Sequence, residues 1–189
     1  MSTIIDKTVR QTRFYRRLHK WLAVPLFAFM FLMGLSGLLL GWKKQTGLLP
    51  PTAKGASVQS RDWLSIHRIE TIAHRFADSL RLSPDIDRID IRPAKGIAKI
   101  VFTNHFTEIQ IDCQTGAIVS VARRNSDFIE KIHDGSLLDF GLGLKSDQIK
   151  LTYTTALSLG LILLSVSGFW LWYNPKRIKG YKARQGVGV

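Results

Sequence analysis

Two long apolar runs dominate the hydropathy pattern of the chain. Residues 21–42 contain no charged side chain, lie between Lys20 and Lys43, and carry a Trp at each end. A helix rises about 1.5 Å per residue, so a helix of this length crosses a hydrocarbon core of about 30 Å, and Trp is typical of the membrane interface. Residues 151–173 are also uncharged and end in aromatic side chains. Both runs are therefore predicted to be transmembrane helices.

The segment between the two runs has the pattern of a small α+β domain. Apolar residues recur every three or four positions in residues 63–80, which predicts an amphipathic helix. Alternating runs at 87–92, 97–103, 106–112 and 117–122, separated by short turn sequences, predict antiparallel strands. The predicted core of this domain is made of apolar residues from these elements: Ile66, Ile69, Phe76, Ile89, Ile91, Ile100, Phe102, Ile109, Ile111 and Ile118.

The predicted fold class is an α+β membrane protein. Two transmembrane helices flank a small extracytoplasmic domain, in which one helix packs on a four-stranded antiparallel sheet. In chain order the segments are a basic cytoplasmic tail (1–20), the first transmembrane helix (21–42), a linker (43–58), the α+β domain (59–124), a short helix with a juxtamembrane segment (125–150), the second transmembrane helix (151–173) and a second basic cytoplasmic tail (174–189). A domain of this size buries only a modest core.

The net charge of +13 is concentrated at the two ends of the chain. Residues 1–20 hold six Lys/Arg against one Asp, and residues 174–189 hold five Lys/Arg and no acidic residue, so each tail contributes +5. Short flanking segments rich in Lys and Arg stay in the cytoplasm, whereas a long loop is translocated largely regardless of its charge. The predicted location is therefore the bacterial inner (plasma) membrane, with both termini in the cytoplasm and the central domain in the periplasm. Anionic lipid headgroups account for the basic tails, and no nucleic-acid partner is predicted.

A cleaved signal peptide is the alternative interpretation of the first apolar run. Signal peptides have an apolar region of about 7 to 15 residues followed by a small-x-small cleavage site. This run is longer, and only a weak cleavage site follows it, around residues 53–56. A retained membrane anchor is therefore the favoured interpretation.

Small residues form a stripe along the first apolar run, at Gly34, Ser36, Gly37 and Gly41. Such stripes let two helices approach closely in lipid. The stripe is interpreted either as the seam of a homodimer or as a contact with the second run of the same chain, which also contains small residues. The contact within the chain is favoured.

Histidines are the candidate site residues, because the single cysteine, Cys113, forms neither an internal disulfide nor a thiolate metal cluster. Cys113 is predicted to pack in the core. His67, Glu70 and His74 share one flank of the predicted helix and are weak candidates for binding Zn, Cu or Fe. The charged flank of an ordinary amphipathic helix has the same pattern. No catalytic constellation is recognised, so no catalytic residue is assigned, and whether the chain is an enzyme stays open.

Several motifs in order along the chain resemble a known family. The strand, turn and strand of residues 109–118, with an acidic residue and a Thr-Gly turn, resemble the signature of PepSY domains. The segments 16–22, 34–38, 132–137 and 167–172 are similar to the PepSY-associated transmembrane family. This resemblance covers nearly the whole chain.

The resemblance implies two different kinds of function. Larger members with four or more spans resemble iron-regulated membrane proteins and ferric-siderophore reductases that carry haem b, whereas soluble PepSY domains resemble modulators that bind peptidases and other partners. His19 and His133 lie in the family motifs and become candidate haem b ligands through this resemblance. A histidine at the lipid interface or at a helix C-terminus explains each of them without haem. The two histidines are expected on opposite sides of the membrane, so one chain alone is not expected to bracket a haem with them.

Two functions are therefore predicted. The leading prediction is a non-enzymatic binding or regulatory subunit, whose periplasmic domain meets a periplasmic protein or peptide. The alternative is a haem b electron-transfer component linked to iron acquisition through iron or siderophore reduction. In that case His19 and His133 would be the ligands in a homodimer or a larger membrane complex.

Overall fold

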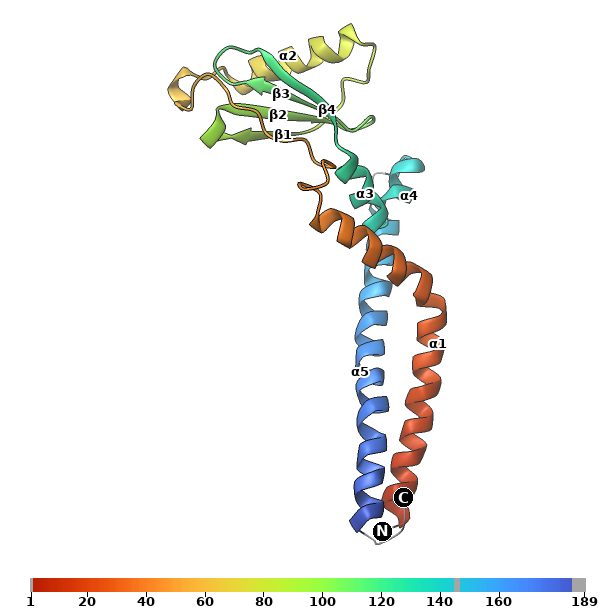
Figure 1. Cartoon of the computed structure of the whole chain (residues 1–189). Coiled ribbons are helices and arrows are strands. Elements are labelled where there is room, and N and C mark those ends of the chain that lie inside the picture. The colour runs from red at the N-terminus through yellow and green to blue at the C-terminus, as the bar shows by residue number, and fades with distance from the viewer. Residues whose placement is uncertain (1, 145–146, 185–189) are drawn as a thin grey trace. The chain divides into compact units, whose positions relative to one another are not determined.

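The computed structural model describes residues 2–144 and 147–184 of the chain (Figure 1). Its elements in chain order are α1 (Ser2–Gly41), the 3-10 turn η1 (Ser60–Asp62), α2 (Ile66–Ser79), β1 (Ile86–Arg92), the 3-10 turn η2 (Pro93–Lys95), β2 (Ile97–Phe102), β3 (Thr107–Asp112), β4 (Ile118–Arg123), α3 (Asn125–His133), α4 (Ser136–Gly141) and α5 (Gln148–Arg184). The contacts divide these elements into two units. The membrane unit comprises residues 1–37 and 132–189, and the α+β unit comprises residues 38–131.

The membrane unit is built on two long helices, and the chain is a membrane protein. Both α1 and α5 are long and apolar enough to cross a bilayer. Each helix continues beyond its predicted apolar run into the basic tail, since α1 begins at Ser2 and α5 ends at Arg184. Most of their apolar surface is exposed within the unit, as expected for helices whose solvent is lipid.

The two long helices lie side by side and contact each other through their side chains (Figure 1). Leu26 of α1 fills the space above Gly160 of α5, where an added Cβ would collide with the leucine side chain. Tyr15 stacks on Trp170 with ring centroids 5.9 Å apart. Small residues of α5 thus meet α1 within one chain. The favoured contact of the α1 stripe with the second run is not seen in the described residues, because Ser36 and Gly37 contact His133 of α3 instead.

In the α+β unit the four strands form an antiparallel meander in the order β1-β2-β3-β4. Helix α2 lies across one face of this sheet (Figure 1). Ser65 caps its N-terminus by accepting a hydrogen bond from the backbone N–H of Arg68. The buried residues between α2 and the sheet are Ile69, Ala73, Ala77, Ala98, Ile100, Phe102, Ile109, Ile111 and Cys113. The predicted α+β fold class is confirmed.

Most of the predicted core residues are inside, but two predictions were wrong. Ile69, Ile100, Phe102, Ile109 and Ile111 are buried, and Phe76, Ile89 and Ile91 are partly buried against them.

Ile66 is 63% exposed and Ile118 is 37% exposed, so neither belongs to the core. Ile66 is the first residue of α2 and lies one turn before Ile69, the first buried position of the helix. Ile118 begins β4, an edge strand with no buried residue, because α2 packs on the other strands. Helical and alternating periodicity identify the apolar face of a helix or strand. They do not show how much of that face another element covers.

Candidate functional site

The linker lies across the second face of the sheet, opposite α2. Residues 50–57, called the strap below, are held there by side chains of β3. Gln110 donates from Nε2 to the Pro51 carbonyl oxygen at 2.8 Å and accepts at Oε1 from the Ala53 N–H at 2.7 Å. Gln110 is fully buried. A segment without hydrophobic periodicity therefore serves as the cover of one sheet face.

Asp112 connects the strap to the turn between β3 and β4. Its Oδ2 accepts from the Ala56 N–H at 2.6 Å, and its Oδ1 accepts from the N–H groups of Gln114 and Thr115 at 2.8 and 3.0 Å. Burial alone would raise the pKa of Asp112, but these backbone hydrogen bonds outweigh it and the pKa is lowered. Gly116 follows with φ +77°, a left-handed conformation that favours glycine. The acidic residue and Thr-Gly turn of the sequence motif thus close the hairpin and anchor the strap.

Under the strap the sheet carries a buried network of charges. Glu108 is 1% exposed and accepts from Lys99 Nζ at 3.0 Å, from Arg124 Nη1 at 2.5 Å and from Gln110 Nε2 at 2.8 Å. Arg124 also donates from Nε to the carboxylate of Asp127 at 2.9 Å. Buried charges persist when they are paired and hydrogen-bonded in this way. Lys99, Glu108 and Gln110 alternate with the core residues of β2 and β3, but alternation does not reveal that a distant segment buries them.

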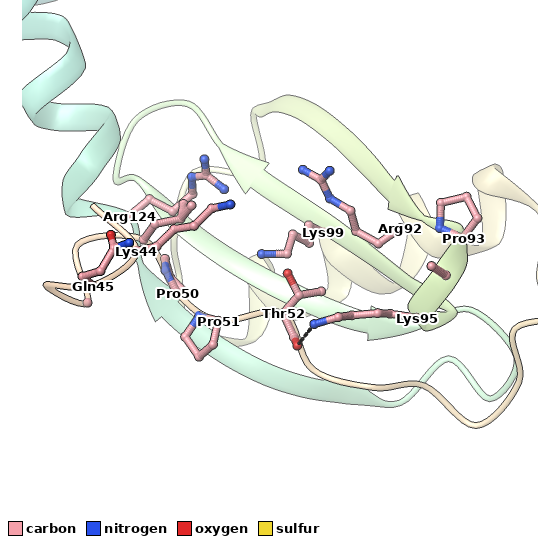
Figure 2. A pocket seen from close by; sticks show the side chains of 13 residues that line it. Lys44, Gln45, Pro50, Pro51, Thr52, Arg92, Pro93, Lys95, Lys99 and Arg124 are labelled. Carbon is pink, nitrogen blue, oxygen red and sulfur yellow. Dashed lines mark hydrogen bonds between the residues drawn. The ribbon is translucent and has the colours of Figure 1, made fainter. Parts of the chain in front are cut away.

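A hollow of about 800 Å³ opens between the strap and the turn from β1 to β2. It is called the groove below. Its cationic lining residues are Lys44, Arg92, Lys95, Lys99 and Arg124, and none of its lining residues is Asp or Glu. Figure 2 shows these side chains, with Lys95 donating a hydrogen bond to the strap. Lys99 and Arg124 are buried, whereas the other three are exposed and form the rim.

Acidic residues outside the groove balance only part of its positive charge. Lys99 and Arg124 are paired in the network under the strap, and Arg92 Nη2 lies 3.5 Å from Asp90 Oδ2 on the exposed surface. Lys95 Nζ donates to the neutral Thr52 carbonyl oxygen at 2.8 Å. The lining also contains no His or Cys. The groove is therefore suited to holding an anion by charge and hydrogen bonds.

His19 of α1 reaches across to α5 in the membrane unit. Its Nδ1 lies 2.9 Å from Ser167 Oγ, and the Ser167 hydroxyl donates to the Leu164 carbonyl oxygen at 3.1 Å. A hydroxyl has one proton, so when it donates to the Leu164 carbonyl oxygen the serine oxygen accepts from Nδ1–H of the imidazole. In the neutral ring this leaves the lone pair on Nε2. Gly168 lies next to the ring, where an added Cβ would be 3.6 Å from His19 Cε1.

His133, the last residue of α3, makes the same kind of contact with α1. Its Nδ1 lies 2.9 Å from Ser36 Oγ, whose hydroxyl donates to the Leu32 carbonyl oxygen at 2.6 Å. An added Cβ on Gly37 would be 3.3 Å from His133 Cε1. Each of the two histidines therefore rests on a Ser-Gly pair of another helix. The sequence identified Ser36 and Gly37 as helix-contact residues but gave no signal for the serine–histidine hydrogen bonds.

The weak metal candidates lie on the exposed flank of α2. His67 Nδ1 is 3.9 Å from Glu70 Oε2, and the His67 side chain is 89% exposed. His74, one turn after Glu70, is exposed as well. Within residues 2–144 and 147–184, no group of three or more His, Cys, Asp or Glu side chains is arranged to hold a metal ion. The structure thus adds nothing to the helical spacing that suggested this trio.

Comparison with known proteins relates the chain to one family. The model of the PepSY-associated TM region matches residues 16–186, a range that includes both long helices, His19 and His133. The resemblance noted in the sequence is confirmed. No curated protein and no solved structure matches the chain.

Proposed function

The chain belongs to the PepSY-associated transmembrane family, and we propose that it is an electron-transfer component that holds haem b through His19 and His133. The supporting observation is that each histidine is hydrogen-bonded at Nδ1 by a serine of another helix. Iron-binding histidines commonly donate the other ring N–H to such a partner, which fixes the ring and its tautomer. Nε2 of each ring is then the atom available for iron. Haem b, when bound, would supply one-electron transfer, while the serines orient the imidazoles.

A second copy of the chain completes each proposed site. Ser36, the partner of His133, lies 36 − 19 = 17 positions beyond His19 in α1, which is about 25 Å along a helix. One haem cannot span that separation, so the two histidines belong to different sites. In a dimer the two copies of His19 would lie near one haem and the two copies of His133 near another. The four long helices of the two chains would surround both sites. Gly34 has open space beside it within the membrane unit and offers a position for close helix approach.

The absorption spectrum of the full chain, produced with haem supplied and purified in detergent, tests this proposal. We expect a Soret band, of which His19→Ala and His133→Ala each remove a separate share. Ser36→Ala should keep the band but change the reduction potential of one haem, because only the orienting hydrogen bond is lost. His74→Ala, on the exposed flank of α2, is the matched control and should change nothing. A folded, haem-supplied protein without a Soret band would end the electron-transfer proposal.

Two glycine variants separate the histidine sites from the dimer contact. Gly37→Leu should displace His133 directly, since even an added Cβ would be 3.3 Å from the ring. It should therefore remove mainly the share of absorbance that His133→Ala removes. A Cβ added at Gly34 meets nothing within 4 Å inside the chain, so Gly34→Leu should act mainly on a neighbouring copy. If Gly34→Leu abolishes the dimer and removes both histidine-dependent parts of the Soret absorbance, the proposed dimer contact is supported. An unchanged dimer and spectrum would place the contact elsewhere.

A second candidate function is a non-enzymatic binding or regulatory subunit that acts through the α+β unit. The basic groove favours it, because several cations and hydrogen-bond donors surround one hollow. In this proposal the protein lies in the bacterial inner membrane, with its termini in the cytoplasm and the α+β unit in the periplasm. The basic tails support that orientation. A protein that folds but binds no haem would retain this role.

A further inference from the structure

We propose that the groove binds a small molecule that carries two or more anionic groups, carboxylate or phosphate. The proposal rests on the binding role described above and does not depend on haem. It is carried by three features of the groove: its cations come from separate elements, its floor is fixed in place, and its size suits a small molecule.

The cations of the rim come from different parts of the α+β unit. Lys44 lies in the turn that follows α1, Arg92 ends β1, and Lys95 ends the η2 turn. They surround one hollow together with the two buried cations. Charges spread around a cavity attract a ligand with several anionic groups more strongly than a single anion, because each group finds its own partner.

The floor of the groove is held in position before any ligand binds. Lys99 and Arg124 have side chains only 4% and 10% exposed, and both are bonded to Glu108. Their ammonium and guanidinium groups therefore cannot swing freely, so a ligand loses little affinity to ordering them. The strap wall is also fixed, because Gln110 holds Pro51 and Lys95 holds Thr52.

The dimensions and walls of the groove favour a small molecule. Ligand sites for small molecules commonly have volumes of about 300 to 1,000 Å³, and the hollow of about 800 Å³ lies in that range. Pro50, Pro51, Pro93 and Ala94 line its sides and present rigid apolar surface to a carbon skeleton. Anionic groups would contact the cations, and the skeleton would contact these walls.

The test is isothermal titration of the full chain in nanodiscs of zwitterionic lipid, with citrate and pyrophosphate as separate probes. We expect at least one probe to bind, with an affinity that falls as salt is raised. The double variant Arg92→Gln/Lys95→Gln removes two rim cations and leaves the buried network intact. It should weaken binding by up to about 25-fold, because exposed charge pairs contribute up to about fivefold each.

The matched control is Arg68→Gln/Arg75→Gln, which removes the same charge from exposed positions of α2. Helix α2 covers the opposite face of the sheet, so this variant should bind the probes as the unmodified chain does. Equal weakening by the two double variants would overturn the proposal, since binding would then follow net charge alone.

Two other results would also overturn the proposal. One is that neither probe binds. The other is that the groove variant changes only the amide protection of the α+β unit in nanodiscs that contain anionic lipid. The second result would assign the cations to the lipid surface. Amide exchange of β2 verifies that each variant is folded. The Soret band is measured on the same samples, so loss of anion binding is distinguished from loss of haem binding. The binding of a protein partner to another surface of the α+β unit is independent of both probes.

Discussion

The charge network beneath the strap gives a sharp prediction for Glu108→Gln. Glu108 has a side chain with no exposed surface and accepts from both Lys99 and Arg124. Glutamine has nearly the same shape but carries no charge, and only one of its two terminal atoms can accept a hydrogen bond. If its oxygen faces Lys99, its amide nitrogen faces the Arg124 guanidinium, which is also a donor. The substitution therefore leaves buried positive charge without its partner.

The expected cost follows from the burial of these groups. Removing one partner of a buried ion pair costs about 3 to 5 kcal/mol, because the remaining charge stays desolvated. Arg124 retains Asp127, which accepts from its Nε at 2.9 Å, so the cost should lie near the lower limit. We expect Glu108→Gln to destabilise the α+β unit by about 3 kcal/mol, which corresponds to a factor of about 150 in the opening equilibrium.

Amide hydrogen exchange measured by mass spectrometry on the full chain in detergent is the appropriate assay. Peptides that cover β2 and β3 report the opening of this unit, and their exchange should accelerate by about 150-fold. Glu130→Gln is the matched control, because Glu130 is exposed on α3 and loses the same charge. Its exchange in β2 and β3 should stay within about twofold of the unmodified chain.

A compensating substitution tests the cause of the loss. Adding Lys99→Met to Glu108→Gln removes one unpaired cation and should recover part of the lost protection. Acceleration below about fivefold in Glu108→Gln, equivalent to about 1 kcal/mol, would refute the reasoning by showing that water solvates this network. A double variant that exchanges faster than the single variant would show that packing, and not charge, determines the loss.

Three further predictions concern the core, acid stability and orientation. Phe76→Ala should lower the free energy of unfolding, measured by amide exchange, by about 2 kcal/mol. This is less than the loss of about 3 to 5 kcal/mol expected for a fully buried phenylalanine, because the ring is only partly buried, with its centroid 6.5 Å from that of Phe102. A loss below about 1 kcal/mol would contradict the packing. The pKa of Asp112 is lower in the folded than in the unfolded chain, so its stabilisation is present above the unfolded value of about 3.9 and is lost as pH falls through the folded value. Asp112→Asn should reduce the pH dependence of stability below about pH 5, and an unchanged pH profile would contradict the role of the carboxylate. Reporters fused after Arg92 should be active only outside the cytoplasm and those after Arg184 only inside, and cytoplasmic activity at Arg92 would overturn the proposed orientation.

The strands and helices of the α+β unit were predictable because local patterns specify them. Each predicted strand boundary lies within one residue of the observed one, since turn sequences such as the one around Gly116 separate the alternating runs. The burial of Cys113 in the core was also predicted correctly. These features depend on neighbours in the sequence, which is why periodicity and turn chemistry identify them.

The cover of the second sheet face and the partners of the histidines depend on distant segments. Alternation places Lys99, Glu108 and Gln110 on one face. Whether water reaches that face depends on the strap, whose Pro51 lies 59 positions before Gln110. His19 bonds a serine 148 positions away, and His133 bonds one 97 positions away. Nothing in a local pattern encodes such pairings, so the sequence pointed to the histidines without revealing what holds them.

The strap also has a consequence for the order in which the domain folds. Each strand of the sheet pairs with its neighbour in the sequence, so hairpins can form as soon as their residues emerge. The strap is synthesised before all of them, yet its anchors Gln110 and Asp112 lie 56 to 59 positions later. It therefore waits for β3, and closing this long loop carries an entropy cost that local hairpins avoid. Until then Glu108 and Lys99 remain hydrated, so the strap is made before the sheet but excludes water from this face only after β3 is in place.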